Sequence, residues 1–233
     1  MLGIALLLAL SSSTAYFIYG KGWDILGILP TKKRTLYFFL GFLLVAILCL
    51  LTILFESVLC SIKWKINQPV NFSLLKKAVS YYFIAAFTEE LVFRGFLFYM
   101  LVKTIKTENA KIISAVCFGL YHWFSYEMFG AGIIPMTYVF IITGLAGYIW
   151  AGAFVKSGTI WLALAMHFSW NLIQSLFKGK GPYGSIVYHQ ISRTELSDLN
   201  NLFLSLFTGI FPSVIMYLGL HLYFSAQKEP QTP

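Results

Sequence analysis

Apolar residues occur along this chain in long runs that are separated by short polar and basic connections. A helix needs about 20 apolar residues to cross the core of a bilayer. The runs approach or exceed that length, and they cover residues 2–19, 36–55, 74–104, 110–126, 134–154, 159–177 and 202–224. The pattern predicts an all-α, polytopic transmembrane bundle with about seven (six to eight) membrane helices.

Two of these runs differ from a simple spanning helix. Leu2–Tyr19 is short and has no basic residue ahead of it. A cleaved signal peptide has a positively charged start, so we expect this run to be retained as the first helix. Residues 74–104 are too long for one straight span, and we expect tilt, a kink or an interfacial start there.

The composition points to a membrane protein without a soluble part. Of the 233 residues, 58% are hydrophobic and 11% are charged, and the mean hydropathy is +0.75. Soluble domains have about 25% charged residues. We therefore expect a single integral-membrane domain over residues 1–233, in a multi-pass protein of the cell membrane if the source is bacterial.

The net charge of +8 comes mostly from lysines and arginines in the connections. Basic connections suit the phosphate groups of membrane lipid, which we expect as a partner. The chain has no soluble basic face that it could present to nucleic acid, so we expect no nucleic-acid partner.

The connections contain few candidates for chemistry. Residues 56–77 mix aromatic and basic side chains, which is typical of an interfacial segment, and residues 178–200 form a polar loop. Glu56 and Glu127 lie at span ends and are interpreted as boundary residues, and His189 as an ordinary surface residue. The cysteines show no metal-ligand spacing and are interpreted as small apolar residues: Cys49, Cys60 and Cys117.

Three charged residues lie close together inside the apolar run 74–104. Charged groups at the centre of a bilayer cost about 2.5–3.5 kcal/mol each on insertion scales. Glu90 and Arg94 are four residues apart and share a helix face, so we expect them to pair. Glu89 lies about 140° from Arg94 around the helix axis. It is left without a local partner and is a candidate for proton transfer.

Two other apolar runs contain polar side chains. His122 lies near the end of its run, whereas His167 and Asn171 are four residues apart on one face of theirs. Each residue alone is also compatible with a structural role, as an interfacial side chain or as a polar contact between helices. Together with Glu89 these residues come from three separate runs, and each needs a polar partner in lipid. We therefore expect them to meet around a small, buried polar cavity.

The spacing of these residues resembles a known family signature. It consists of Glu89-Glu90-x-x-x-Arg94, then Phe118-x-x-x-His122, then His167-x-x-x-Asn171, with the run Ser157–Trp161 ahead of the third motif. The order is similar to the three motifs of the CAAX-protease and bacteriocin-processing (CPBP) family, also called the type II CAAX-prenyl endopeptidase or Abi family. The resemblance covers about residues 78–175, which would carry the catalytic core.

This resemblance implies an intramembrane endopeptidase with an all-helical fold. Glu89 would be the general base that activates water, with help from His122. His167 and Asn171 would stabilise the oxyanion, and Glu90 with Arg94 would hold the geometry of the site. The substrate would be a lipidated, prenylated CAAX-type peptide or another membrane-associated peptide, cleaved near its C-terminus, and no metal or cofactor would be needed.

Three alternatives remain open from the sequence. Two histidines and a glutamate can bind zinc with an open water position, so a zinc-dependent version of the same protease is the main chemical alternative. Buried Glu, His and Arg also build proton relays in transporters, although no repeated halves are visible. A non-catalytic member, such as a bacteriocin immunity factor, is the third.

Overall fold

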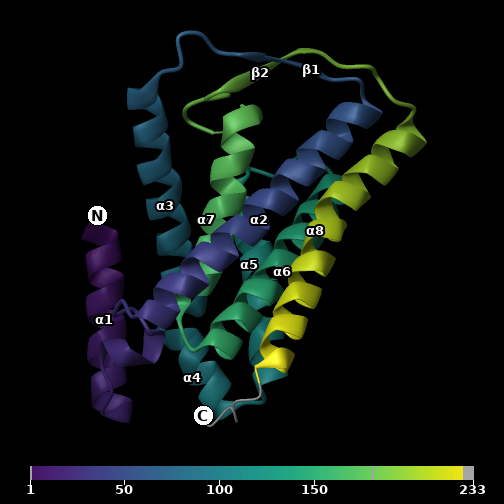
Figure 1. Ribbon diagram of the computed structural model, residues 1–233. Helices are drawn as coiled ribbons and strands as arrows, with labels where there is room; N and C mark the ends of the chain where they lie inside the picture. The colour runs from purple at the N-terminus through teal and green to yellow at the C-terminus, as the bar shows by residue number, and fades with distance from the viewer. Residues whose placement is uncertain (1, 180, 228–233) are drawn as a thin grey trace.

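The computed structural model describes residues 2–179 and 181–227, and it is almost entirely helical (Figure 1). The helices, in chain order, are α1 (Leu2–Tyr19), α2 (Lys32–Leu59), α3 (Phe72–Arg94), α4 (Phe96–Thr104), α5 (Thr107–Ser125), α6 (Ile133–Ser157), α7 (Ile160–Phe177) and α8 (Asp198–Ala226). The remaining elements are the short 3₁₀ helix η1 (Trp23–Leu26) and the strands β1 (Lys63–Ile66) and β2 (Tyr188–Ser192). The predicted all-α fold is confirmed.

Four helices in the described part of the chain are long and apolar enough to cross a membrane: α2, α6, α7 and α8. α1 is a shorter apolar helix. α3 and α5 carry the polar residues that the sequence singled out, which lowers their hydropathy. That these two helices and α1 also span the membrane, giving about seven spans, stays a prediction.

The long run 74–104 is broken, as expected, by a kink. α3 ends at Arg94 and α4 begins at Phe96, with Gly95 between them. A Cβ atom at Gly95 would collide with the carbonyl oxygen of Leu91, so the absent side chain permits the bend. The break places Glu89, Glu90 and Arg94 in the last turns of α3.

α7 is the innermost of the long helices. It packs against α2, α3 and α6 (Figure 1), and 61% of its apolar window is buried inside the bundle. Its start is fixed by Gly158, which ends α6 in the left-handed region at φ 64°, and by Thr159, which caps α7. Glycine is favoured at a positive φ because it has no Cβ. This turn sets the position of every α7 side chain.

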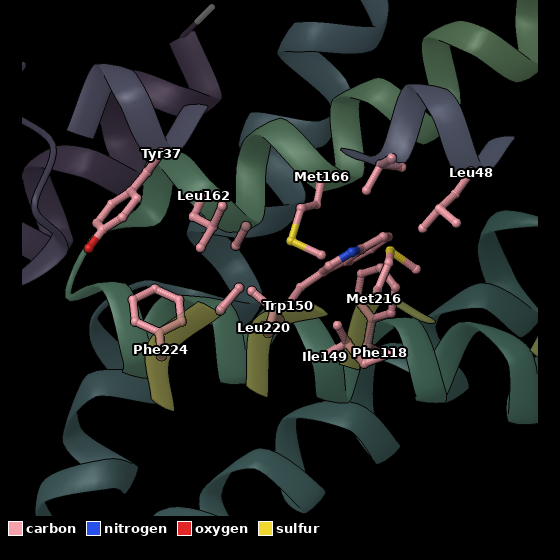
Figure 2. Close-up of a cluster of buried hydrophobic side chains, with 13 residues drawn as sticks. Tyr37, Leu48, Phe118, Ile149, Trp150, Leu162, Met166, Met216, Leu220 and Phe224 are labelled. Carbon is pink, nitrogen blue, oxygen red and sulfur yellow. The ribbon is translucent and has the colours of Figure 1, made fainter. Parts of the chain in front are cut away.

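The main hydrophobic core lies between α2, α5, α6, α7 and α8. Figure 2 shows the indole of Trp150 among Met166, Met216 and Phe118, which come from three other helices. The core therefore extends directly to the helices that carry the candidate site residues.

Two of the connections contain short strands that the sequence did not predict. β1 lies in the segment expected to be interfacial and pairs antiparallel with β2, which lies in the segment expected to be a polar loop. The ribbon covers one end of the bundle, at the top of Figure 1. Such short, exposed strands have no strong local pattern, because their pairing partner is more than a hundred residues away in the chain.

Glu56 is not a simple boundary residue. Its carboxylate accepts hydrogen bonds from Lys178 at 2.6 Å and from Arg193 at 2.8 Å, and only 12% of its side chain is exposed. It ties the end of α2 to the end of α7 and to the residue that follows β2. This cluster could not be predicted from the sequence because its three members are far apart in the chain.

Candidate active site

The two adjacent glutamates of α3 have different surroundings. The side chains of Glu90 and Arg94 are 0% exposed, whereas that of Glu89 is 19% exposed. Burying a charged group in lipid or protein requires a partner. The difference agrees with the helix geometry, which predicted one paired and one unpaired acid.

Arg94 joins α3 to α5 and α6. Its Nη1 atom lies 3.4 Å from Oε1 of Glu90, which confirms the expected pair. Its Nη2 atom donates a hydrogen bond to the carbonyl oxygen of Gly147 at 2.8 Å. The guanidinium also lies over the ring of Phe118, 4.5 Å from the centroid. The charge is therefore shared among a carboxylate, a backbone carbonyl and an aromatic face.

Gly147 makes this contact with Arg94 possible. A Cβ atom there would lie 3.1 Å from Nη2 of Arg94 and 3.1 Å from Cβ of Phe118. Both distances are tighter than an ordinary van der Waals contact. The sequence indicated only that the glycines of α6 allow close helix packing. It did not indicate that Arg94 lies against one of them and donates a hydrogen bond to its carbonyl oxygen.

His167 connects both glutamates. Its Nδ1 atom lies 2.9 Å from Oε1 of Glu90, and its Nε2 atom lies 3.7 Å from Oε2 of Glu89. An ionised carboxylate only accepts hydrogen bonds, so Nδ1–H donates to Glu90. Glu90 thereby fixes the orientation of the imidazole and leaves Nε2 directed at Glu89.

Trp150 of α6 supports His167 from one side. The two rings are stacked, with centroids 4.1 Å apart and an angle of 16° between their planes. Phe118 contacts the imidazole edge-on, with centroids 5.9 Å apart. Trp150 was not predicted as a site residue, because a tryptophan in an apolar run is usually a core or interfacial residue.

His122 lies in the last turn of α5, and its side chain is buried. Its Nδ1 atom lies 2.8 Å from the carbonyl oxygen of Phe118, so Nδ1–H donates and Nε2 is left as an acceptor. Its ring packs against Phe118 at 4.4 Å and against Tyr126 at 4.8 Å between centroids. Phe118 therefore contacts both histidines.

Asn171 lies one turn beyond His167 on α7 and is half-buried. Within residues 2–179 and 181–227 it makes no hydrogen bond to either glutamate or histidine of the site. The structure thus brings Glu89, Glu90, Arg94 and His167 into one group and joins His122 to it through Phe118. Asn171 lies one turn away on the same helix, and no hydrogen bond joins it to them among the described residues.

Two carboxylate oxygens of the site are buried without a hydrogen bond, Oε2 of Glu89 and Oε2 of Glu90. Buried polar atoms normally have partners, so a site that binds a polar molecule explains them. No three His, Cys, Asp or Glu side chains of the described residues are grouped so that they could hold a metal ion. The zinc alternative would need the histidines and Glu89 in such a group.

Comparison with protein families agrees with this arrangement. Residues 71–173 match the family model of Rce1-like type II CAAX prenyl endopeptidases. This stretch is a domain of that family. It contains all of α3, α5 and α6 and reaches His167 and Asn171 of α7. No curated protein and no solved structure matches the chain.

The resemblance based on the three motifs is therefore confirmed over residues 71–173. The Rce1-like endopeptidases are a family of glutamate-type intramembrane proteases. Together with the long apolar helices, the match over residues 71–173 indicates a multi-pass membrane protein that contains a domain of this protease family.

Proposed function

We propose that this protein hydrolyses a peptide bond near the C-terminus of a membrane-associated peptide, using water activated by Glu89. The observation that carries the proposal is the approach of Glu89 and His167, whose Nε2 and Oε2 atoms are 3.7 Å apart. Both lie within a bundle of about seven membrane helices and would face a small polar cavity. The substrate would be a lipidated, prenylated CAAX-type peptide or another membrane-bound peptide.

The charges of the site support this assignment of roles. Glu89 and Glu90 carry negative charge, and Arg94 carries positive charge. His167 is held by its stacking on Trp150 and by the hydrogen bond from Nδ1 to Glu90. A hydrogen on Nε2 would be a donor for the oxyanion of a tetrahedral intermediate.

The reaction then follows from these positions. Glu89 accepts a proton from water as the hydroxyl attacks the carbonyl carbon of the scissile bond, with His122 helping to position the water. His167 and Asn171 donate hydrogen bonds to the oxyanion. The proton held by Glu89 passes to the leaving amine as the C–N bond breaks. Glu90 and Arg94 keep the imidazole of His167 in place.

Glu89→Gln tests the proposed base. The purified protein in detergent is given a peptide that ends in a prenylated cysteine and three further residues, and the same peptide without the lipid. General base catalysis contributes about 10²–10⁴-fold, so we expect hydrolysis to fall at least a hundredfold. Glu127→Gln, a change in an exposed acid outside the site, serves as the matched control. Hydrolysis that survives Glu89→Gln would refute the assignment.

The zinc alternative is tested in the same assay. We expect full activity after treatment with a chelator, because Glu89 activates the water directly. Loss of activity on chelation and recovery with zinc would favour the metal-dependent mechanism. Unchanged activity of Asn171→Ala would remove Asn171 from the oxyanion site.

A further inference from the structure

A second polar site lies outside the candidate active site, between the start of α5, the end of α6 and the second half of α8. A pocket is present there, and its lining residues are Lys111, Tyr148, Ile149, Gly152, Lys156, Tyr217 and Leu220. None of these residues was assigned a role by the sequence motifs. Two lysines and two tyrosines in one pocket make it rich in hydrogen-bond donors.

Lys111 is held rigidly in this pocket. Its side chain is only 10% exposed, and its Nζ atom lies 2.7 Å from Oε1 of Glu108 and 4.5 Å from the centroid of the Tyr148 ring. The hydroxyl of Tyr148 donates to the other oxygen of Glu108 at 2.7 Å. Both oxygens of Glu108 are thus already in use. A Cβ at Gly152 would lie 3.9 Å from Cδ of Lys111, which is an ordinary van der Waals contact.

Lys156 has no such counter-ion. It lies in the last turn of α6, is half-buried and lines the same pocket. In the part of the chain that the structure describes, no carboxylate lies within ion-pair distance of it. The charge of Lys111 repels Lys156, and the charge of Glu108 attracts it. Two ammonium groups line the pocket, and the carboxylate of Glu108 lies beside Lys111, so one positive charge is left that an anion would balance.

The surroundings of the pocket favour a lipid as the source of that anion. Lys156 ends a candidate membrane span, where lipid headgroups are found. α8, which lines the same pocket, exposes apolar side chains, with Leu218 46% and Leu222 68% exposed. A phosphate group at the lysines would leave the acyl chains beside these residues. Basic pockets between membrane helices bind phosphate-bearing headgroups in this way.

We propose that this pocket binds a phosphate group, and that an anionic phospholipid supplies it. Lys156 and Lys111 bind the phosphate oxygens, and Tyr217 of α8 lies beside them in the pocket. The site is independent of the proposed hydrolysis, because no residue that lines it contacts Glu89 or His167 among the described residues.

The test uses the full-length protein in detergent and measures lipid binding by native mass spectrometry, with phosphatidylglycerol and phosphatidylcholine as probes. A lysine near a membrane surface contributes about 1 kcal/mol of attraction to anionic lipid. We therefore expect Lys156→Gln to weaken phosphatidylglycerol binding about fivefold. Tyr217→Phe removes a hydroxyl donor without removing a charge, and it should weaken phosphatidylglycerol binding less than Lys156→Gln does.

Lys106→Gln is the matched control, because Lys106 is an exposed lysine just before α5 and has no part in the pocket. The proposal would be overturned if Lys106→Gln and Lys156→Gln weakened phosphatidylglycerol binding equally, which would indicate general surface attraction. It would also be overturned if neither variant weakened this binding. A second arm measures thermal stability with inorganic phosphate and no added lipid. The protein could be stabilised by phosphate only when Lys156 is present and yet bind phosphatidylglycerol no better than phosphatidylcholine. That result would support the phosphate site, with free phosphate instead of a lipid as its ligand.

Discussion

At the scale of single residues, Glu90 organises the candidate active site more than its sequence suggests. Its Oε1 atom accepts from Nδ1 of His167 at 2.9 Å and lies 3.4 Å from Nη1 of Arg94. The shorter of these contacts is the one to the histidine, which is 77 positions away in the chain. A carboxylate behind a histidine fixes its orientation, so the second glutamate of the motif acts through His167.

Trp150 is expected to be a positioning residue for His167. Trp150→Phe keeps an aromatic ring in the stack, whereas Trp150→Leu removes it. Stacked aromatic pairs contribute about 0.5–1.5 kcal/mol, so we expect kcat of the Leu variant to be about threefold to tenfold below that of the Phe variant. The KM should be similar in both, because the indole is buried in the core and does not line a substrate surface.

Both Trp150 variants lose volume from the main core, so their free energies of unfolding are measured beside the kinetics. Assays are compared at temperatures where both proteins are fully folded. Equal kcat values under those conditions would show that Trp150 is only a core residue.

At the scale of secondary-structure elements, glycines decide how closely α5 and α6 approach. A Cβ at Gly119 of α5 would lie 2.8 Å from Cδ2 of Phe140 and 2.9 Å from its carbonyl oxygen. Gly147 of α6 is in close contact with Phe118 and Arg94. Small residues at such crossings allow the backbones to pack tightly. This packing brings Gly147 and Trp150 to the residues of α3 and α7.

Gly147→Ala should therefore disturb both stability and activity. The new methyl group would press on Arg94, which is buried and hydrogen-bonded, and on Cβ of Phe118, which is fixed by its own helix. Overpacking typically costs about 1–3 kcal/mol. We expect a loss of that size in the free energy of unfolding, together with a decrease in the rate of peptide hydrolysis.

Gly152→Ala provides the comparison on the same helix, because a Cβ at Gly152 would meet nothing closer than 3.9 Å. Alanine is favoured over glycine in a helix by up to about 1 kcal/mol, so this variant should be neutral or more stable. If Gly147→Ala and Gly152→Ala have the same free energy of unfolding and the same rate of peptide hydrolysis, the close contact at Gly147 does not control the position of Arg94.

At the scale of the whole molecule, the β1–β2 ribbon closes one end of the bundle, and Glu56 anchors it. Lys178 and Arg193 both donate to this carboxylate, and the N–H of Thr194 donates to the carbonyl of Cys60 at 2.8 Å. Trp64 of β1 packs against Phe177 at the end of α7, with centroids 5.4 Å apart. The ribbon is thus joined to α2 and α7 by both charge and aromatic contacts.

Glu56→Gln should loosen this end of the molecule. Hydrogen bonds to charged groups contribute about 1.5–3 kcal/mol each, and the amide of glutamine replaces them poorly. We expect faster hydrogen exchange at the amides of β1 and β2 and little change at the centre of α7. Glu195→Gln, a change in an exposed acid after β2, should leave the exchange unchanged. Equal exchange in both variants would mean that the ion cluster does not hold the ribbon.

Much of the candidate site could be predicted from local geometry. The pairing of Glu90 with Arg94 follows from their spacing of four residues on a helix, and it is present. The length of the run that contains Arg94 predicted tilt, a kink or an interfacial start, and a kink is present after Arg94. The roles of Trp150, Gly147 and Glu56 could not be predicted, because each depends on a contact with another helix or with the ribbon.

Apolar runs and spaced polar residues are enough to establish a helical membrane protein and the order of its motifs, since both depend on periodicity and composition. Which polar groups meet depends on the packing of the helices. A helix wheel gives directions around one axis and contains no distance to another helix. Whether His167 reaches Glu90, Glu89 or a partner elsewhere depends on how α3, α6 and α7 pack.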